Sequence, residues 1–499
     1  MPPRRCGDGN LPVIIRMQSH LLKRLLILPV FLGLTACAMV GPNHTAPQPA
    51  LPAAWSQQDQ VTDPVVRATR TGDVSRWWRQ LNDPLLTGLM DEALQASPDL
   101  RLAQARLREA RARRGVAAAG RFPELTAAAA ARRSHASGEV GSGTTNDLFS
   151  AGLDAGWEID IFGGVRRSVE AAEADAAAIA ADLGDTRVSL TAEVALNYVE
   201  VRGLQQRLAI ARANLASQSE TQQLTEWRQQ AGLVGAQDVE QARSNREQTR
   251  AQIPSLETSL AETEHRLDIL IGKAPGTVHP RLAAARDLPS MPARVAVGIP
   301  ADTLRRRPDI RAAERRLAAA TARVGAAEAA RYPAFNLSGS IGLEALTAAN
   351  LGTSGAATSS LVAGVTAPIF DAGRLRQQVA IQDAVREQAR VTYEQTVLAA
   401  LQDVENALVA LKRSTERGEA LAAAAAAARN AAQMARQQYS VGLIDFQSVL
   451  DSERNVLIVE DSLAGTRTDG LLAFIRLYKA LGGGWTPPDD SRQAGKDIP

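Results

Sequence analysis

The chain contains 499 residues, of which 45% are hydrophobic, 22% are charged and only 4% are aromatic, and its formal net charge is +2. So small a net charge gives no reason to expect nucleic-acid binding. Alanine, the strongest helix former, takes the place of the missing aromatic residues, for example from Ala422 to Ala428. This composition favours thin walls of closely packed helices over a wide globular core.

The N-terminal region has the pattern of a secretory signal peptide. Lys23 and Arg24 precede an apolar run over residues 25–36, which is shorter than the roughly 20 residues that a membrane-spanning helix needs. The run leads into Leu-Thr-Ala-Cys, which resembles the lipobox of bacterial lipoproteins. The resemblance implies cleavage before Cys37 and acylation of its thiol and new N-terminus. We therefore predict a signal peptide over residues 1–36 and a lipid anchor at Cys37.

The residues around this signal refine the prediction. Met17 is the expected start, which would leave Cys6 out of the chain. Ala38 follows the lipobox cysteine, whereas similar lipoproteins retained at the inner membrane carry Asp there, so the outer membrane is implied. Residues 37–75 contain many proline, glycine and polar residues, which predicts an extended linker without a core of its own.

After this linker the chain repeats with one offset of 210 residues, as in Pro98 and Pro308. The matching segments are 97–101 and 307–311, 121–123 and 331–333, 232–234 and 442–444, and 266–272 and 476–482. One offset shared by separated segments indicates duplication of a domain-sized unit, not a solenoid. We divide the chain into a first copy (76–275), a linker (276–299), a second copy (300–485) and a polar tail (486–499).

Each copy begins with a predicted helix, opened by Pro98 or Pro308 and ended before Pro123 or Pro333. Two predicted strands follow in each copy, because apolar and other residues alternate there. These strands cover residues 125–131 and 148–157 in the first copy, and 335–343 and 361–367 in the second. Two isolated strand pairs would be marginal in water, so they require a sheet supplied from elsewhere.

A helix of unusual length comes next in each copy. Proline is absent from residues 164–230 and 373–439, and apolar residues keep a seven-residue spacing with one four-residue step, which is typical of a coiled coil with a stutter. At 1.5 Å per residue, ~67 residues reach roughly 100 Å. After turns at Gly232 and Gly442, return helices are predicted that end near the next glycines of each copy, 272 and 482.

This order of elements resembles the outer-membrane factor family, which includes TolC-like channels and lipidated NodT-type efflux proteins. The motifs that carry the resemblance are Trp77-Trp78, Asp83-Pro84-Leu85, Arg307-Pro308-Asp309-Ile310 and the segments 157–163 and 368–373. The resemblance extends from residue 37 to Trp485. It implies an α+β fold, in which a homotrimer builds a long periplasmic α-helical barrel and a transmembrane β-barrel of twelve strands, four from each chain. Closure of such a barrel removes every strand edge, as a membrane demands.

The same resemblance implies the outer-membrane channel of a tripartite efflux system, a passive exit duct for drugs or other small toxic compounds. Its implied partners are a periplasmic adaptor protein, an inner-membrane pump of the RND type and outer-membrane lipid, and its implied location is the outer membrane, with an extension into the periplasm. Two alternatives stay open at this point. One is the outer-membrane channel of a type I secretion system, and the other is a periplasmic coiled-coil lipoprotein without a pore.

Candidate gate residues follow the second turn. Asp451 and Arg454 come nine and twelve residues after Gly442, where similar proteins use an Asp and an Arg in a closed periplasmic tip. Acidic side chains around a threefold axis repel one another unless partners hold them. Ser448 replaces a second aspartate found in some relatives, while the first copy carries Asp238. The alternative is that Asp451 and Arg454 are an ordinary solvated helix pair.

The turns themselves, at Gly232-Leu233 and Gly442-Leu443, are the predicted contacts with the adaptor. No zinc-ligand spacing, phosphate loop or nucleophile elbow is found in the sequence. We therefore predict no catalytic residue, no metal and no cofactor. A lipid-anchored envelope enzyme would need a site that the sequence does not display.

Overall fold

The computed structural model describes residues 39–49, 51–56, 66–67, 74–292, 295–296 and 304–486. The predicted signal peptide, the Cys37 anchor and nearly all of the polar tail lie outside these residues. The chain divides into two compact units. The sheet unit consists of Met1–Thr45, Arg111–Asp175 and Leu317–Ala389, and the helical unit consists of Ala46–Ala110, Ala176–Arg316 and Arg390–Pro499.

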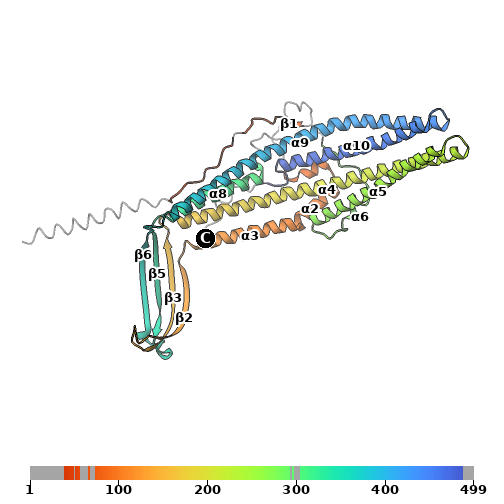
Figure 1. Ribbon diagram of the computed structural model, residues 1–499. Coiled ribbons are helices and arrows are strands. Elements are labelled where there is room, and N and C mark those ends of the chain that lie inside the picture. Colours follow the sequence, from red (N-terminus) through yellow and green to blue (C-terminus); the bar gives the residue numbers. More distant parts are fainter. Residues whose placement is uncertain are drawn as a thin grey trace, which may run out of the picture. The chain divides into compact units, whose positions relative to one another are not determined.

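The sheet unit contains one sheet of four antiparallel strands, in the order β2-β3-β5-β6 (Figure 1). Their bounds are β2 Glu124–His135, β3 Thr145–Ile159, β5 Ala334–Ala345 and β6 Ala357–Thr366. All four strands predicted from the alternation are confirmed. The two strand pairs are not isolated, because β3 of the first copy pairs with β5 of the second, with Phe149 opposite Ala345.

The helices repeat with the offset found in the sequence. In the first copy they are α3 Pro98–Ala119, α4 Gly164–Gln230 and α5 Ala236–Leu270, and in the second α8 Pro308–Ala329, α9 Arg374–Ser440 and α10 Phe446–Ala480. Every bound in the second set lies 210 residues after its counterpart in the first. The two long helices are each 67 residues. Among the described residues, no helix is both long and apolar enough to cross a membrane.

Glycines with positive φ set the ends of the long helices. Gly163 (φ 85°) precedes α4 and Gly232 (φ 72°) follows it, which is the left-handed backbone that glycine adopts without a steric cost. Between them the predicted seven-residue spacing lies on the buried face, where Val194 and Val201 are completely buried. The long helix predicted from the proline-free run and the coiled-coil spacing is therefore confirmed.

The core of the helical unit gathers around an aromatic group. The Trp77 ring stacks on the Tyr478 ring with their centres 5.5 Å apart. Helix α2 (Pro84–Ala96) follows a short 3-10 helix η3 (Val74–Leu81), and the Asp83 carboxylate caps it by accepting from the Leu85 and Leu86 amides. This helix was not predicted from the Asp83-Pro84 motif, although a capping Asp followed by proline is a helix start signal.

The two linkers contribute to this core. Trp55 is only 4% exposed and joins the same cluster, and β1 (Val66–Arg67) pairs in parallel with β4 (Val295–Ala296). A short helix, α6 (His279–Leu282), buries Leu282. Within the predicted linker, the described residue Trp55 is therefore packed into the core of the helical unit.

Candidate channel wall and tip

The pairing register gives the sheet two unlike faces. Residues opposite one another in neighbouring strands point to the same side, so a consistent register gathers their side chains. Leu153, for example, lies opposite Ala127 on one side and Ile341 on the other. The apolar face contains Leu125, Ala127, Ala129, Ala131, Phe149, Ala151, Leu153, Ala155, Trp157, Ile159, Phe335, Leu337, Ile341, Leu343, Leu361, Ala363 and Val365.

The opposite face of the sheet is polar and largely acidic. It carries Glu124, Asp154, Glu158 and Glu344, together with serines and threonines such as the hydrogen-bonded pair Ser340 and Ser360. Several apolar side chains on the other face are well exposed in the single chain, including Leu361 at 77%. An apolar band on one face and acceptor groups on the other suit a wall between lipid and water.

The two ends of the apolar face differ. At the helix end, the indole nitrogen of Trp157 donates to the Arg121 carbonyl oxygen at 3.1 Å, which suits an amphipathic ring at a membrane boundary. At the β2–β3 loop end, Arg133 forms a two-point ion pair with Asp147, which lies opposite it in the register. The uncharged apolar stretch lies between these ends.

Each long helix ends in a tight turn, and we call the two turns and the helix ends beside them the tip. The Leu233 amide donates to the Arg228 carbonyl oxygen at 2.8 Å, and the Leu443 amide donates to the Gln438 carbonyl oxygen at 2.9 Å. These bonds close the helix ends around Gly232 and Gly442, both of which have positive φ. The predicted turns are confirmed in position. Their apolar side chains remain exposed, at 66% for Leu233 and 74% for Leu443.

Contacts between the copies hold the tip together. Arg228, near the end of α4, donates to the Tyr439 carbonyl oxygen of α9 at 2.6 Å. Its guanidinium carbon lies 4.5 Å from the centre of the Tyr439 ring, a cation–π distance. An apolar cluster surrounds this contact and buries Phe446 and Val449 of α10 together with Ala242 of α5.

A buried carboxylate follows Val449 of this cluster along α10. Glu453 is 4% exposed and accepts from the Thr221 hydroxyl at 2.5 Å. Burial raises its pKa, while the Thr221 bond and the charge of Arg436 act in the opposite direction. Glu453 was not among the predicted site residues, because nothing in its local sequence distinguishes it from the neighbouring exposed acids.

The gate candidates lie on the two return helices, α5 and α10, and Asp451 and Arg454 have different hydrogen-bond partners. Asp451 is exposed and accepts from the Gln447 side chain at 3.0 Å. Arg454 donates from Nε to the Asn245 amide oxygen of α5 at 3.1 Å. Asp238 lies in the first turn of α5, where a helix N-terminus favours a negative charge. Arg454 thus joins two return helices, and Asp451 presents a carboxylate to solvent.

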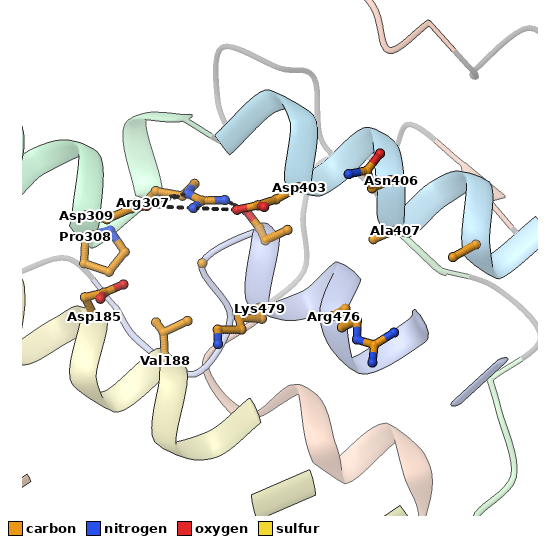
Figure 2. Close-up of a pocket in the computed structure, with 13 residues that line it drawn as sticks. Asp185, Val188, Arg307, Pro308, Asp309, Asp403, Asn406, Ala407, Arg476 and Lys479 are labelled. Atoms are coloured by element: carbon orange, nitrogen blue, oxygen red, sulfur yellow. Dashed lines mark hydrogen bonds and ion pairs between the residues drawn. The ribbon is translucent and has the colours of Figure 1, made fainter. Parts of the chain in front are cut away.

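The Arg307-Pro308-Asp309 motif borders a cavity of about 490 Å³ in the helical unit (Figure 2). Arg307 bridges Asp309 and Asp403 and also donates to the Ala480 carbonyl oxygen at 3.0 Å. Asp185 faces the same cavity, and burial together with the Asp309 charge raises its pKa. The motif therefore ties the start of α8 to α9 and α10.

Comparison with known proteins decides the family. The model of the outer membrane efflux protein family matches residues 89–273 and 299–483, one match in each copy. This chain belongs to the outer membrane efflux protein family. Nodulation protein T of Rhizobium leguminosarum bv. trifolii is 34% identical over 470 residues, which cover 92% of this chain and 97% of that protein.

Other relatives agree. The pyoverdine export outer membrane protein OpmQ of Pseudomonas putida is 34% identical over 478 residues, which cover 94% of this chain and 99% of OpmQ. The solved structure of the outer-membrane channel OprN has a TM-score of 0.84 and 37% identity, and the match covers 90% of this chain and 100% of OprN. The predicted family and α+β fold are confirmed. The chain is an outer-membrane efflux channel protein, and its location is the outer membrane.

Proposed function

We propose that three copies of this efflux protein close their sheets into one twelve-stranded barrel and their helices into one periplasmic tunnel. The observation that carries the proposal is the two-faced sheet, whose outer strands β2 and β6 each pair with a single neighbour within the described part of the chain. Unpaired strand edges are too costly to expose to lipid, because no water is there to bind the free amides and carbonyls. Pairing of β6 with β2 of the next copy removes all of these edges.

The tip is the proposed contact with a periplasmic adaptor protein, which links the channel to an inner-membrane pump of the RND type. The exposed leucines at the two turns, Leu233 and Leu443, and the neighbouring Val441 at 70% exposure support this role. Each chain offers two such turns, so a trimer offers six. Apolar side chains on rigid, glycine-closed turns are suitable anchors for a partner.

Asp451, Arg454 and Asp238 are the proposed gate at this tip. Three Asp451 carboxylates around the trimer axis would repel one another and favour cations. In this account Arg454 restrains the tip through Asn245, since that bond joins α10 to α5. Loss of both side chains would relax the constriction.

Two further parts of the proposal concern the anchor and the cargo. Acylation of Cys37 would fasten the chain to outer-membrane lipid, and several acyl chains hold far better than one. The cargo would be drugs or other small toxic compounds, which leave passively through the tunnel. The named export role of the relative OpmQ supports an export function but does not fix the cargo.

Two experiments test the channel. A purified chain should migrate as a trimer on a gel without heating, and boiling should dissociate it. A deletion strain should become more sensitive to at least one class among antibiotics, detergents and metals, and the wild-type gene should restore resistance. A chain that stays monomeric in outer-membrane extracts would refute the shared barrel, and unchanged sensitivity to all three classes would refute the cargo.

A further inference from the structure

A buried arginine near the start of α4 binds the N-terminal segment. Arg167 is 1% exposed, and a buried cation is costly unless its donors are satisfied. Its Nε donates to the Val40 carbonyl oxygen at 3.1 Å, and its Nη2 donates to the Gly41 carbonyl oxygen at 3.1 Å and the Asn43 side-chain oxygen at 2.8 Å. Only Glu170, at 2.8 Å from Nη1, is a partner on its own helix. Most of the bonds of this arginine therefore hold residues 40–43.

Two glycines make the space for this contact. A Cβ atom on Gly325, in the interior of α8, would lie 2.8 Å from Nε of Arg167. A Cβ atom on Gly41 would lie 2.4 Å from the Gly325 Cα, and Gly41 also has a φ of 86°. Glycine weakens a helix interior, so its use at position 325 has a packing reason. The N-terminal backbone thus lies directly on the backbone of α8.

The same segment is fixed to the end of β3. The Val40 amide donates to the Phe162 carbonyl oxygen at 3.1 Å, three residues after the end of the strand at Ile159. A Cβ atom on Gly163 would lie 2.7 Å from Cγ of Met39. Residues 39–43, Arg167 and Gly325 therefore form one compact arrangement, which we call the N-terminal clamp.

The positions that match Gly325 and Arg167 in the other copy, Gly115 and Gln377, form no such clamp. Gly115 on α3 lies 210 residues before Gly325, but a Cβ atom there would meet no heavy atom within 4 Å. The counterpart of Arg167 is Gln377, which is exposed in the chain. Both copies have this glycine but only the first has the buried arginine, so the clamp pairs Arg167 of the first copy with Gly325 of the second, and the reciprocal pair Gln377 and Gly115 does not form one.

We propose that Arg167 is a positioning residue for the lipid anchor, which it holds beside the membrane end of β3. This inference rests on the proposed acylation of Cys37, which precedes Met39 by two residues in the sequence. With the clamp closed, acyl chains in the outer membrane keep β3 at the membrane surface while the sheet assembles. Without the clamp, only a flexible segment would join the acylated residue to the sheet, and the local concentration of the sheet at the membrane would fall.

The clamp is tested with Arg167→Gln and Gly325→Ala, and Gly115→Ala serves as the matched control. Hydrogen exchange of the purified trimer measures the protection of the Val40 amide. We expect this amide to exchange at least about tenfold faster in the first two variants and at the wild-type rate in the control. In cells, the first two variants should give several-fold less heat-resistant trimer in the outer membrane. Unchanged exchange at Val40, or an equal loss in the control, would overturn the proposal.

A second arm separates positioning from general stability. An unlipidated chain, with Cys37→Ser behind an ordinary cleavable leader, is folded into detergent micelles, where no membrane anchor is needed. There Arg167→Gln should reach the trimer as well as its parent chain does, and a loss as large as in cells would show a structural role instead. Labelled palmitate reports the acylation itself. A wild-type chain without the palmitate label would refute the lipid anchor. If wild type and Arg167→Gln carried equal label and the variant also gave a normal yield of trimer, only the positioning role of Arg167 would be refuted.

Discussion

The two hairpins of the tip come from equivalent parts of the two copies, yet they differ in almost every side chain that stabilises them. Asp445 is the N-cap of the second-copy helix α10, and its carboxylate accepts from the Ser448 amide, whereas the N-cap of α5 is Gly235, which has no side chain to cap the helix. The second copy buries Phe446, where the first has Ala236 at the same offset. Duplication thus preserved the backbone, while the packing that closes the tip was concentrated in the second copy.

The first copy contributes a different kind of group. Arg228 reaches across to Tyr439, and the residue 210 positions later is Gln438, which lacks the charge. Thr221 likewise donates to Glu453, whose counterpart in the first copy is Arg243. The comparison teaches that the copies are complementary at the tip, since one supplies the apolar cluster and the other supplies donors to it.

Removal of the Phe446 ring from the second copy should lower the stability of the tip the most. Phe446→Ala deletes a side chain that is 3% exposed, which should lower the local unfolding free energy of the tip by about 3–5 kcal/mol. Hydrogen exchange over residues 435–450 measures the change. Val239→Ala in the first copy is the control and should cost far less, because Val239 is only half-buried. Equal losses from both changes would contradict the asymmetry.

Removal of the contact between Arg228 and Tyr439 should lower the stability of the tip by a smaller amount. Arg228→Gln gives the first copy the residue that the second has, and removes a charge-assisted bond and a cation–π contact. We expect a loss of about 1–2 kcal/mol in the same exchange measurement. Gln438→Ala, at the exposed matched position, should change little. If Arg228→Gln left the protection of residues 435–450 intact, the bridge would have no stabilising role.

The buried acid should make the tip sensitive to pH, with the smallest effect of the three. Because burial raises the pKa of Glu453 above its ordinary value of 4.5, its stabilising contribution is complete below that value and is lost as pH rises through the raised pKa. Tip protection should therefore fall as pH increases over this window. Glu453→Gln should remove the dependence, and Arg243→Gln at the matched position should keep it. A wild-type tip with greater protection at higher pH would have the wrong sign.

Much of the fold was predictable because local patterns repeat with one offset. The length of α4 followed from a proline-free run with seven-residue apolar spacing and from the turn at Gly232, and the strands followed from alternation. The missed features depend on residues far apart in the chain, such as Arg228 and Tyr439, which are 211 residues apart. Two aromatic residues beside Gly442, in a chain with 4% aromatics, were the available signal for the tip cluster.

The gate itself was predictable only in part. The family resemblance located Asp451 and Arg454 on the helix after the second turn, and both lie there. It did not identify Asn245 as the partner of Arg454, because that hydrogen bond depends on the packing of α5 against α10. The bond from Gln447 to Asp451 lies within α10, four residues apart. The constriction between three chains stays a prediction.

The most direct test of the unequal copies is single-channel conductance in a planar bilayer. The second-copy variant changes Asp451→Ala and Arg454→Ala together, and the first-copy variant changes Gln241→Ala and Ser244→Ala at the same offset. If the second copy supplies the constriction, the second-copy variant conducts several-fold more current than wild type, while the first-copy variant conducts as wild type does. Equal conductance in all three channels, or an equal increase in both variants, would contradict that claim.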